Sequence, residues 1–343
     1  MSGSPDKPNA PSLPRMADVA EAAGVTQMTV SRALRDPDKV APGTLARVKA
    51  AIAETGYVPN VVAGVLSGRS KSRIVTAVIP TIQHAIFADT VTGLSEALRP
   101  HGYHLMLGET GYRLEEEDAL IAAFLAHRPD AFMLTGVTRS KHSRNLLKRS
   151  GVPIVETWEL ARTPLDMVVG YSNEDAAHAM TRYLAERGYR RIAFVSGPSR
   201  TNERARRREL GYARALGELG LPVLPILTIG EPSVPHLEEG AAILDAVLAL
   251  TPDAVFFTSD VYAVGALMAA QARCLDVPGA LGIAGFHDLP IARVVSPGLT
   301  TVHVPAHEIG VLAGRKILAS LAGAAEPKKS IIPFTLVPRQ STR

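Results

Sequence analysis

The stretch "AAGVTQMTVSRALRDPDKV", residues 22–40, predicts the end of one helix, a tight turn and a second helix. Apolar residues recur at helical spacing up to Gly24, which has the conformational freedom to end the first segment. Beyond the turn, Val30, Ala33 and Leu34 share a face that we expect to pack on a core. A helix-turn-helix pair is therefore the expectation for this part of the chain.

A third helix completes a small all-α unit over residues 16–57. Pro42 stands where the first turn of a helix tolerates it, and Leu45, Val48 and Ile52 follow at helical spacing. A unit this small can bind a partner but has little room for a catalytic site.

The second helix begins with a polar cluster whose residues are Thr26, Gln27, Met28, Thr29, Ser31 and Arg32. Thr26 can cap the helix, and the others are either an ordinary solvated face or a surface shaped to meet a partner. Residues 15–73 hold nine Lys and Arg against five Asp and Glu, and this surplus equals the net charge of the whole chain, +4. The N-terminal end is thus the basic part, as in a module that binds phosphates.

The segments that flank this unit are poor formers of regular structure. Residues 1–15 hold four prolines and three serines, and we predict a disordered tail. Residues 58–72 are predicted to be a hinge, because Val61 and Gly64 lower helix propensity and so short a helix needs a partner to form.

The composition is that of a globular protein with more than one domain. The chain has 343 residues, of which 46% are hydrophobic and 20% charged. It shows no apolar run long enough to span a bilayer and no signal peptide, so we expect a cytoplasmic protein without a membrane partner. The single cysteine, Cys274, excludes an internal disulfide and is expected to be a small buried hydrophobe.

From residue 73 the pattern changes to short β-branched runs that alternate with helical stretches. Ten candidate strands form two sets of five, and they lie at 74–80, 103–109, 131–136, 153–157, 167–171, 191–197, 222–229, 254–259, 281–286 and 299–305. We predict an α/β domain of two lobes, each a doubly wound parallel sheet. The N-lobe would take about 73–172 and 301–330, and the C-lobe about 173–300. A ligand would bind in the cleft, at the carboxyl ends of the strands.

No motif of a known catalytic class stands in these lobes. The sequence has no GxSxG, GxxxxGK or GxGxxG pattern in a suitable context. His303 and His307 are four apart, but Pro305 between them argues against a shared helix face and hence against a metal site. We therefore predict neither an enzyme nor a cofactor.

The segment from "MADVAEAAGVTQMTVSRAL" through "GYVPNVVAGVLSG" resembles the helix-turn-helix headpiece and hinge of the lactose/galactose repressor family of bacterial transcription regulators. The resemblance implies a periplasmic-binding-protein-like effector domain after the hinge, and a homodimer that binds double-stranded operator DNA. It places Gln27, Met28 and Arg32 on base-reading positions, and Thr29 and Ser31 on phosphate-contacting ones. In the hinge it gives Leu66 the role of a minor-groove wedge, with contacts from Asn60 and Ala63. A linker residue packed on the lobes is the alternative for Leu66.

The same resemblance identifies candidate effector contacts. Ile86 and Phe87 follow the first strand, Arg208 precedes Gly211 by three, and further candidates are Ser259, Asp260 and His287. Ser259 and His287 depart from the Asn and Asp that the family often has, and exchange of an acid for His287 favours an anionic ligand. The alternative for His287 is a loop histidine with satisfied hydrogen bonds. The alternative for the cluster Arg204, Arg206, Arg207 and Arg208 is a solvated face, expected for at least two of them.

Four segments are similar to the gluconate-utilisation repressors: "FADTVTGLSEALRPHGYHLMLGETGY", "VVGYSNEDAAHAM", "GYRRIAFVSG" and "IAGFHD". By this resemblance Glu156 and Trp158 reach into the pocket, and the effector is a sugar acid such as gluconate or a phosphorylated relative. Two alternatives stay open: a sugar-binding receptor without a DNA role, and an enzyme acting on a sugar acid.

Overall fold

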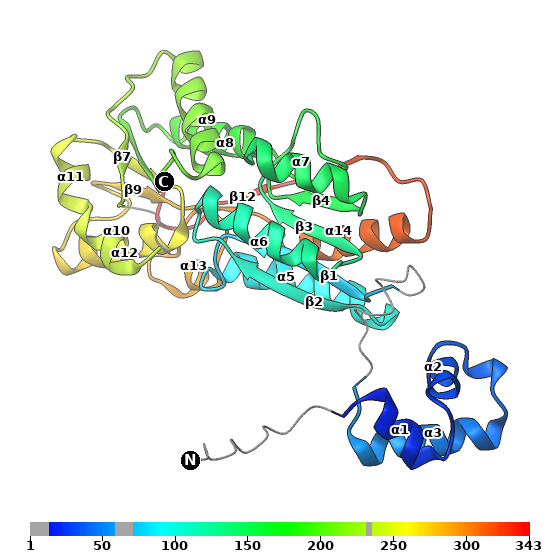
Figure 1. Ribbon diagram of the computed structural model, residues 1–343. Helices are drawn as coiled ribbons and strands as arrows, with labels where there is room; N and C mark the ends of the chain where they lie inside the picture. The colour runs from blue at the N-terminus through cyan, green and yellow to red at the C-terminus, as the bar shows by residue number, and fades with distance from the viewer. Residues whose placement is uncertain (1–13, 59–70, 231–234) are drawn as a thin grey trace, which may run out of the picture. The chain divides into compact units, whose positions relative to one another are not determined.

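The computed structural model describes residues 14–58, 71–230 and 235–343. The chain divides into two compact units, the first ending at Lys71 and the second running from Ser72 to Arg343 (Figure 1). Most of the predicted tail and hinge therefore lies outside the described residues.

The first unit is a bundle of three α-helices with a small apolar core. Its elements are α1 (Met16–Ala23), α2 (Gln27–Arg35), the 3₁₀ turn η1 (Pro37–Lys39) and α3 (Pro42–Thr55). Its buried apolar residues are Val19, Ala20, Ala23, Val30, Ala33, Val48, Ala51 and Tyr57. The expectation that Leu34 faces this core is wrong: its side chain is 37% exposed. A single narrow stripe of this short helix, formed by Val30 and Ala33, packs on the core.

The second unit contains two parallel sheets, as predicted. The first has the strand order β11-β5-β4-β3-β1-β2 and the second β7-β6-β8-β9, and every pairing in both is parallel. The strands of the first sheet are β1 (Ile74–Ile79), β2 (His104–Glu109), β3 (Ala131–Thr135), β4 (Ile154–Thr157), β5 (Met167–Gly170) and β11 (Lys329–Ile331). Those of the second are β6 (Ile192–Ser196), β7 (Leu227–Thr228), β8 (Ala254–Phe257) and β9 (Gly282–Ala284).

The prediction of five strands in each lobe is wrong in detail. β10 (Thr301–His303) pairs antiparallel with β12 (Thr335–Val337) instead of completing the second sheet. Isolated bridges, from Ala284 to Thr300 and from His287 to His303, connect this segment to β9 and to the residues that follow it. β11 and β12 were not predicted, because each is three residues long and too short for a period-2 pattern.

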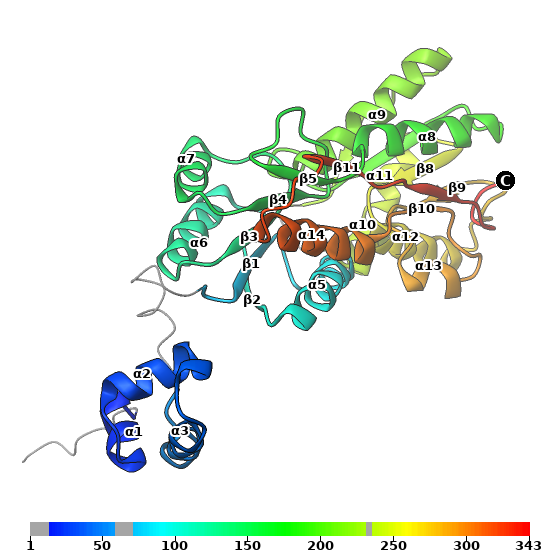
Figure 2. The ribbon, with the colours of Figure 1, turned by 90° about the vertical axis from the view of Figure 1, so that its right-hand side faces the viewer.

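Helices cover both faces of each sheet, which explains the continuous apolar runs of the strands. Figure 2 shows α5 and α14 side by side against one face of the first sheet. On the opposite face, Val78 and Phe132 pack with Ile121 of α6 and Leu147 of α7. The helices of this sheet are α5 (Ala85–Leu98), the 3₁₀ turn η2 (Arg99–His101), α6 (Leu114–Ala126), α7 (Lys141–Ser150) and α14 (Ala306–Leu321).

The second sheet is covered in the same way. Phe194 and Phe256 pack with Tyr212 of α9, while Val195 and Phe257 belong to the cluster that includes α11 and α12. The helices are α8 (Asn173–Glu186), α9 (Glu203–Leu219), α10 (Leu237–Ala242), α11 (Leu244–Ala249), α12 (Asp260–Ala272) and α13 (Pro290–Val294).

Close contact between α8 and α9 fixes the helix that carries the arginine cluster. A Cβ atom at Gly211 of α9 would overlap the backbone carbonyl of Glu174 in α8, so only glycine allows the two helices to approach this closely. Gly211 thus sets the position of Arg208, one turn earlier on α9.

Two further observations bear on the sequence predictions. Cys274 is exposed, which contradicts the expectation of a buried thiol; it follows the end of α12 in a left-handed conformation with φ of 54°. Among the described residues, no helix combines the length and the apolar character needed to cross a bilayer.

Candidate functional site

The structure presents the polar cluster of the first unit at the start of an exposed helix. Gly24 ends α1 in a left-handed conformation with φ of 62°, and Thr26 caps α2, its hydroxyl accepting a hydrogen bond from the backbone N–H of Thr29 at 3.2 Å. Gln27 and Met28 are exposed in the first turn, Met28 to 74%. The N-terminal end of the helix is thus open to a partner.

Charges on this face are unevenly paired. Arg35 is neutralised by Asp36, whose carboxylate lies 2.9 Å from the guanidinium, and this hydrogen bond holds the pKa of Asp36 below its usual range. Arg32 is exposed and lies within 4 Å of no carboxylate in the part of the chain that the structure describes. Gln27, Met28, Ser31, Arg32 and Arg35 border one shallow surface hollow. An unpaired guanidinium beside exposed amide and thioether groups suits the edges of bases in a major groove.

Three of the predicted DNA contacts are outside the described residues. Asn60, Ala63 and Leu66 fall within 59–70.

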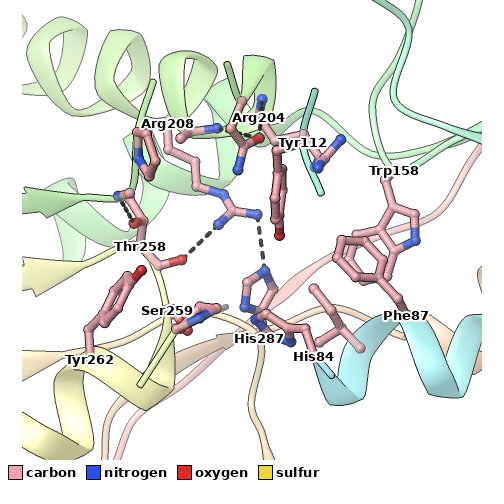
Figure 3. Close-up of a pocket in the computed structure, with 16 residues that line it drawn as sticks. His84, Phe87, Tyr112, Trp158, Arg204, Arg208, Thr258, Ser259, Tyr262 and His287 are labelled. Atoms are coloured by element: carbon pink, nitrogen blue, oxygen red, sulfur yellow. Dashed lines mark hydrogen bonds between the residues drawn. The ribbon is translucent and has the colours of Figure 1, made fainter. Parts of the chain in front are cut away.

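A cavity in the second unit lies at the carboxyl ends of several strands (Figure 3). It encloses about 560 Å³ of space between protein atoms, the open solvent at its mouth included. Six of the eight predicted effector contacts line it: Ile86, Phe87, Trp158, Arg208, Ser259 and His287. They come from α5, from α9 and from the segments that follow β4, β8 and β9.

Arg208 is the central cation of this cavity and is 5% exposed. Its Nε donates to Asn173 at 2.9 Å and its Nη1 to the carbonyl of Thr258 at 2.8 Å, which fixes the direction of the side chain. Its guanidinium also stacks 3.8 Å from the centroid of the Phe286 ring. Within the described ranges no carboxylate forms an ion pair with Arg208. The buried Glu159 stabilises its charge from farther away and is linked to it through Asn173, whose amide donates to Glu159 at 3.0 Å.

His287 accepts a hydrogen bond from Arg208, with 3.1 Å between its Nε2 and the guanidinium Nη2. A guanidinium can only donate, so Nε2 is the acceptor and carries no proton. The single N–H of the neutral ring is therefore on Nδ1. Burial, the nearby Arg208 and His84 all disfavour the charged form and lower the pKa of His287 well below its ordinary value. The Nδ1 atom is buried and has no partner among the described residues.

His84 lies 5.3 Å from His287 between ring centroids, in an edge-on arrangement. Burial, followed by the charges of Arg208 and Arg204, lowers the pKa of His84 to about 4. Both histidines are therefore neutral at physiological pH, and the arginines carry the positive charge of the cavity.

Trp158 forms the aromatic wall. Its backbone has φ of 74°, a conformation that costs energy for a bulky residue, and its ring packs at 5.5 Å against Phe87. The indole Nε1 is a buried donor without a partner in the described chain. Strain that aims an unsatisfied donor is typical of a binding site.

The lining has a strong excess of hydrogen-bond donors. None of the sixteen lining residues is Asp or Glu, whereas two are arginines and two are neutral histidines. A ligand rich in acceptors and carrying negative charge fits such a surface, because each buried donor needs an acceptor.

Glu156 does not line this cavity, which contradicts the expectation that it reaches into the pocket. Its Oε1 accepts from Arg139 at 2.7 Å and its Oε2 from the backbone N–H of Leu165 at 2.9 Å. Burial raises the pKa of Glu156, and Arg139 opposes that shift. The pair holds the segment after β3 in place and leaves the carboxylate no free oxygen for a ligand.

Asp260 is likewise outside the lining. Its Oδ1 accepts from the hydroxyl of Thr301 at 2.5 Å and its Oδ2 from the backbone N–H of Leu289 at 2.7 Å. Complete burial raises its pKa to about 7. Asp260 therefore ties α12 to the segments that carry His287 and β10, which is a structural role.

Several lining residues were not predicted from the sequence. They are His84, Tyr112, Asn202, Arg204, Thr258 and Tyr262, with backbone or small contacts from Gly197, Pro198, Ala205 and Pro235. The spacing within the arginine cluster is the sequence feature that could have identified Arg204. Arg204 and Arg208 are four apart on α9 and both buried, whereas Arg206 and Arg207 are exposed.

Comparison with known proteins places both units. Residues 15–60 match the model of bacterial regulatory proteins of the lacI family, and residues 181–342 match that of the periplasmic binding protein-like domain.

Similarity to regulators extends over nearly the whole chain. The HTH-type transcriptional regulator GntR of Escherichia coli K12 is 34% identical over 95% of this chain and 97% of its own length. The regulator of that name from Pseudomonas aeruginosa is also 34% identical, over 96% of both chains. Among solved structures, a LacI family transcriptional regulator from Silicibacter pomeroyi superposes with a TM-score of 0.90 at 30% identity, covering 96% of this chain and 99% of its own.

Proposed function

The chain belongs to the lacI family of bacterial regulatory proteins, and from this premise we propose that it is a homodimeric repressor whose operator affinity is set by a small sugar acid. As a member of that family it is a DNA-binding transcriptional regulator and not an enzyme. In the proposal it acts in the cytoplasm, on double-stranded operator DNA. Residues 16–57 would form the DNA-binding domain, 58–72 the hinge and 73–343 the effector and dimerisation domain.

The observation that carries the effector class is the cavity without carboxylates around Arg208. The lining holds two guanidinium groups and no carboxylate, and a neutral sugar brings no negative charge to meet them. A carboxylate accepts from several donors at once and compensates the charge of Arg208. The buried donors on His287 and Trp158 are further candidates for contacts with it.

Gluconate, or a phosphorylated relative, is the effector that the resemblance to gluconate-utilisation repressors favours. Trp158 offers an apolar face for the C–H groups of the carbon chain, and Ile86 and Phe87 extend that wall. Ser259 already accepts from the backbone N–H of Val261 at 3.3 Å, but its hydroxyl proton remains available for a ligand.

The DNA contacts in this proposal come from α2 and the hinge. Gln27, Met28 and Arg32 would read base edges, while Thr26, Thr29 and Ser31 approach phosphates. Asn60, Ala63 and Leu66 would contact the minor groove. Effector binding would change how the lobes of two mates meet, and only about 1.4 kcal/mol of coupling is needed for a tenfold change in operator affinity.

Calorimetric titration of the full-length protein tests the effector class. We expect saturable binding of gluconate or 6-phosphogluconate and none of glucose at the same concentration. Binding of glucose or a purine alone would contradict the proposal. A gel-shift assay with and without the bound sugar acid then tests whether the ligand controls DNA affinity, and a ligand without effect on the operator complex would contradict that part.

A further inference from the structure

Arg204 is a buried cation, and the neighbouring carboxylates of Glu117 and Glu203 form no ion pair with it. Its side chain is 7% exposed, and its guanidinium makes no hydrogen bond or ion pair with any residue that the structure describes. The guanidinium lies over the ring of Phe87, whose centroid is 5.8 Å from the guanidinium carbon. The guanidinium therefore borders the cavities with its hydrogen-bond donors free for a ligand, and a buried guanidinium gains most from an acceptor that carries negative charge.

The local structure holds Arg204 in this place. Asn202 caps α9 by accepting from the backbone N–H groups of Arg204 and Ala205, which orients the first turn. Gly136, which follows β3, leaves room for the Glu203 carboxylate and for the guanidinium, since a Cβ there would lie 2.5 Å from Glu203 Oε1 and 3.0 Å from Arg204 Nη1. The chain thus shapes a space for this cation between α9 and the first sheet.

Arg204 stands where two cavities meet. It lines the cavity around Arg208 and also a neighbouring cavity that encloses about 900 Å³, and Tyr112 and Asn202 are shared in the same way. Beyond Arg204 the second cavity offers hydroxyl groups, among them those of Thr110, Thr138 and Thr201. It also contains Glu115, Glu117 and Glu203, which partly balance its cations, and of those cations Arg204 is the one that also lines the first cavity.

The two buried arginines face different parts of this space. Arg208 is turned toward Thr258 and His287, as Figure 3 shows, whereas Arg204 lies over Phe87 and beside Gly136. They project from α9 four residues apart, with Cβ atoms about 6 Å from one another. Two separate anionic groups on a short chain match two such cations better than one carboxylate does.

We propose that Arg204 binds a second anionic group of the effector, so that the effector is a polyol with an anionic group at each end. An aldonic acid phosphorylated at its far end and an aldaric acid, with two carboxylates, both have this chemistry. The inference rests on the proposed sugar-acid effector and adds that this effector carries two anionic groups.

Calorimetry on the full-length protein at fixed ionic strength tests this, with gluconate, glucarate and 6-phosphogluconate as ligands. We expect at least one of the two ligands with two anionic groups to bind at least tenfold more tightly than gluconate. If glucarate binds more tightly, the second anionic group is a carboxylate. If 6-phosphogluconate binds more tightly, it is a phosphate. Gluconate binding as tightly as both would overturn the proposal while leaving the sugar-acid effector intact. If none of the three anionic ligands binds and glucose does, both this inference and the proposed sugar-acid effector are wrong.

Two variants on the same helix locate the effect. Arg204→Gln should reduce the preference for the doubly charged ligand to less than threefold while gluconate affinity changes little. Arg207→Gln removes an equal charge from the exposed side of α9 and should leave the preference unchanged. Arg204→Lys keeps the charge and should give an intermediate preference. A preference that survives Arg204→Gln, in a variant whose melting temperature and operator binding match those of the parent, would overturn the assignment of Arg204.

Discussion

The guanidinium of Arg208 donates a hydrogen bond to Nε2 of His287 across 3.1 Å, and this contact joins α9 to the segment after β9. Because the donor is always charged, the contact selects the neutral tautomer of His287 with its proton on Nδ1. A histidine here orients Arg208 without neutralising it. An acid in the same place would form an ion pair and remove the charge that faces the cavity.

Replacement of Arg208 tests whether its charge binds the effector. Arg208→Gln should lower sugar-acid affinity by about 10- to 150-fold, since a charge-assisted hydrogen bond contributes about 1.5–3 kcal/mol. Operator affinity without effector should stay within threefold of the parent. Calorimetry and a gel-shift assay measure the two quantities, with Arg207→Gln as the control for loss of charge on α9. Equal affinity in parent and variant would contradict the role given to Arg208.

Substitution of His287 tests whether the absence of negative charge at this position favours binding of an anionic ligand. His287→Asp places a carboxylate beside Arg208 and should weaken binding of sugar acids by more than tenfold relative to His287→Asn, which is neutral and similar in size. The comparison of the two variants by calorimetry separates charge from lost packing. If both variants weaken binding equally, repulsion of the anion is not the reason for a histidine at this position.

The pKa of His84, lowered to about 4, links the folded state to pH. Unfolding returns this pKa to about 6.5, so the unfolded chain binds more protons below that pH, and stability falls as the pH drops from about 6.5 toward 4. His84 alone should account for about 2 kcal/mol of lost stability between pH 7 and pH 5. Asp260, with a pKa raised to about 7, changes stability in the opposite direction over that range.

The measurement is therefore a difference between proteins. Urea unfolding of the parent and of His84→Gln at pH 5 and pH 7 should show that the parent loses more stability on acidification than the variant. The same loss in both would mean that His84 titrates normally in the folded state.

The periodicity of apolar residues was sufficient to predict the helices of the first unit and both parallel sheets. It predicted a strand at β10 but not its antiparallel pairing with β12. It missed β11 and β12, which are three residues long and pair with segments far apart in sequence. At the site, the resemblance directed attention to Arg208 and His287 but also to Glu156 and Asp260, whose carboxylates are occupied by Arg139 and by Thr301. Sequence cannot show which polar residue at a strand end has a protein partner, because those partners come from other segments.

Arg204 illustrates the same limit. In the sequence it is one of four arginines within five residues, and only the helical phase relative to the core distinguishes it from Arg206 and Arg207. Its separation of four residues from Arg208 places both on one face of α9, which is the signal that could have found it.

Packing of α9 on α8 should be sensitive to a single methyl group. Gly211→Ala forces the new Cβ against the carbonyl of Glu174, and we expect a loss of about 1–3 kcal/mol in unfolding free energy together with weaker effector binding. Gly217 lies on the same helix with no atom within 4 Å of the position of a Cβ, so Gly217→Ala should be neutral or stabilising by up to about 1 kcal/mol. Urea unfolding of the two variants measures both values. Similar effects of both substitutions would mean that helix propensity, and not the contact with α8, decides the outcome.

Met28 offers the sharpest test of the proposal that α2 reads DNA bases. Its side chain is 74% exposed, so Met28→Gln should change the melting temperature little, and an amide in place of a thioether replaces apolar contact with paired hydrogen bonding. We expect selection from a randomised operator library to shift at one or two base pairs toward adenine, which a glutamine amide can bind through two hydrogen bonds. Arg35→Gln, on the same helix but paired with Asp36 in the parent, serves as the control and should leave the selected sequence unchanged. A uniform loss of affinity for all sequences in Met28→Gln would show that this residue supports binding without reading bases.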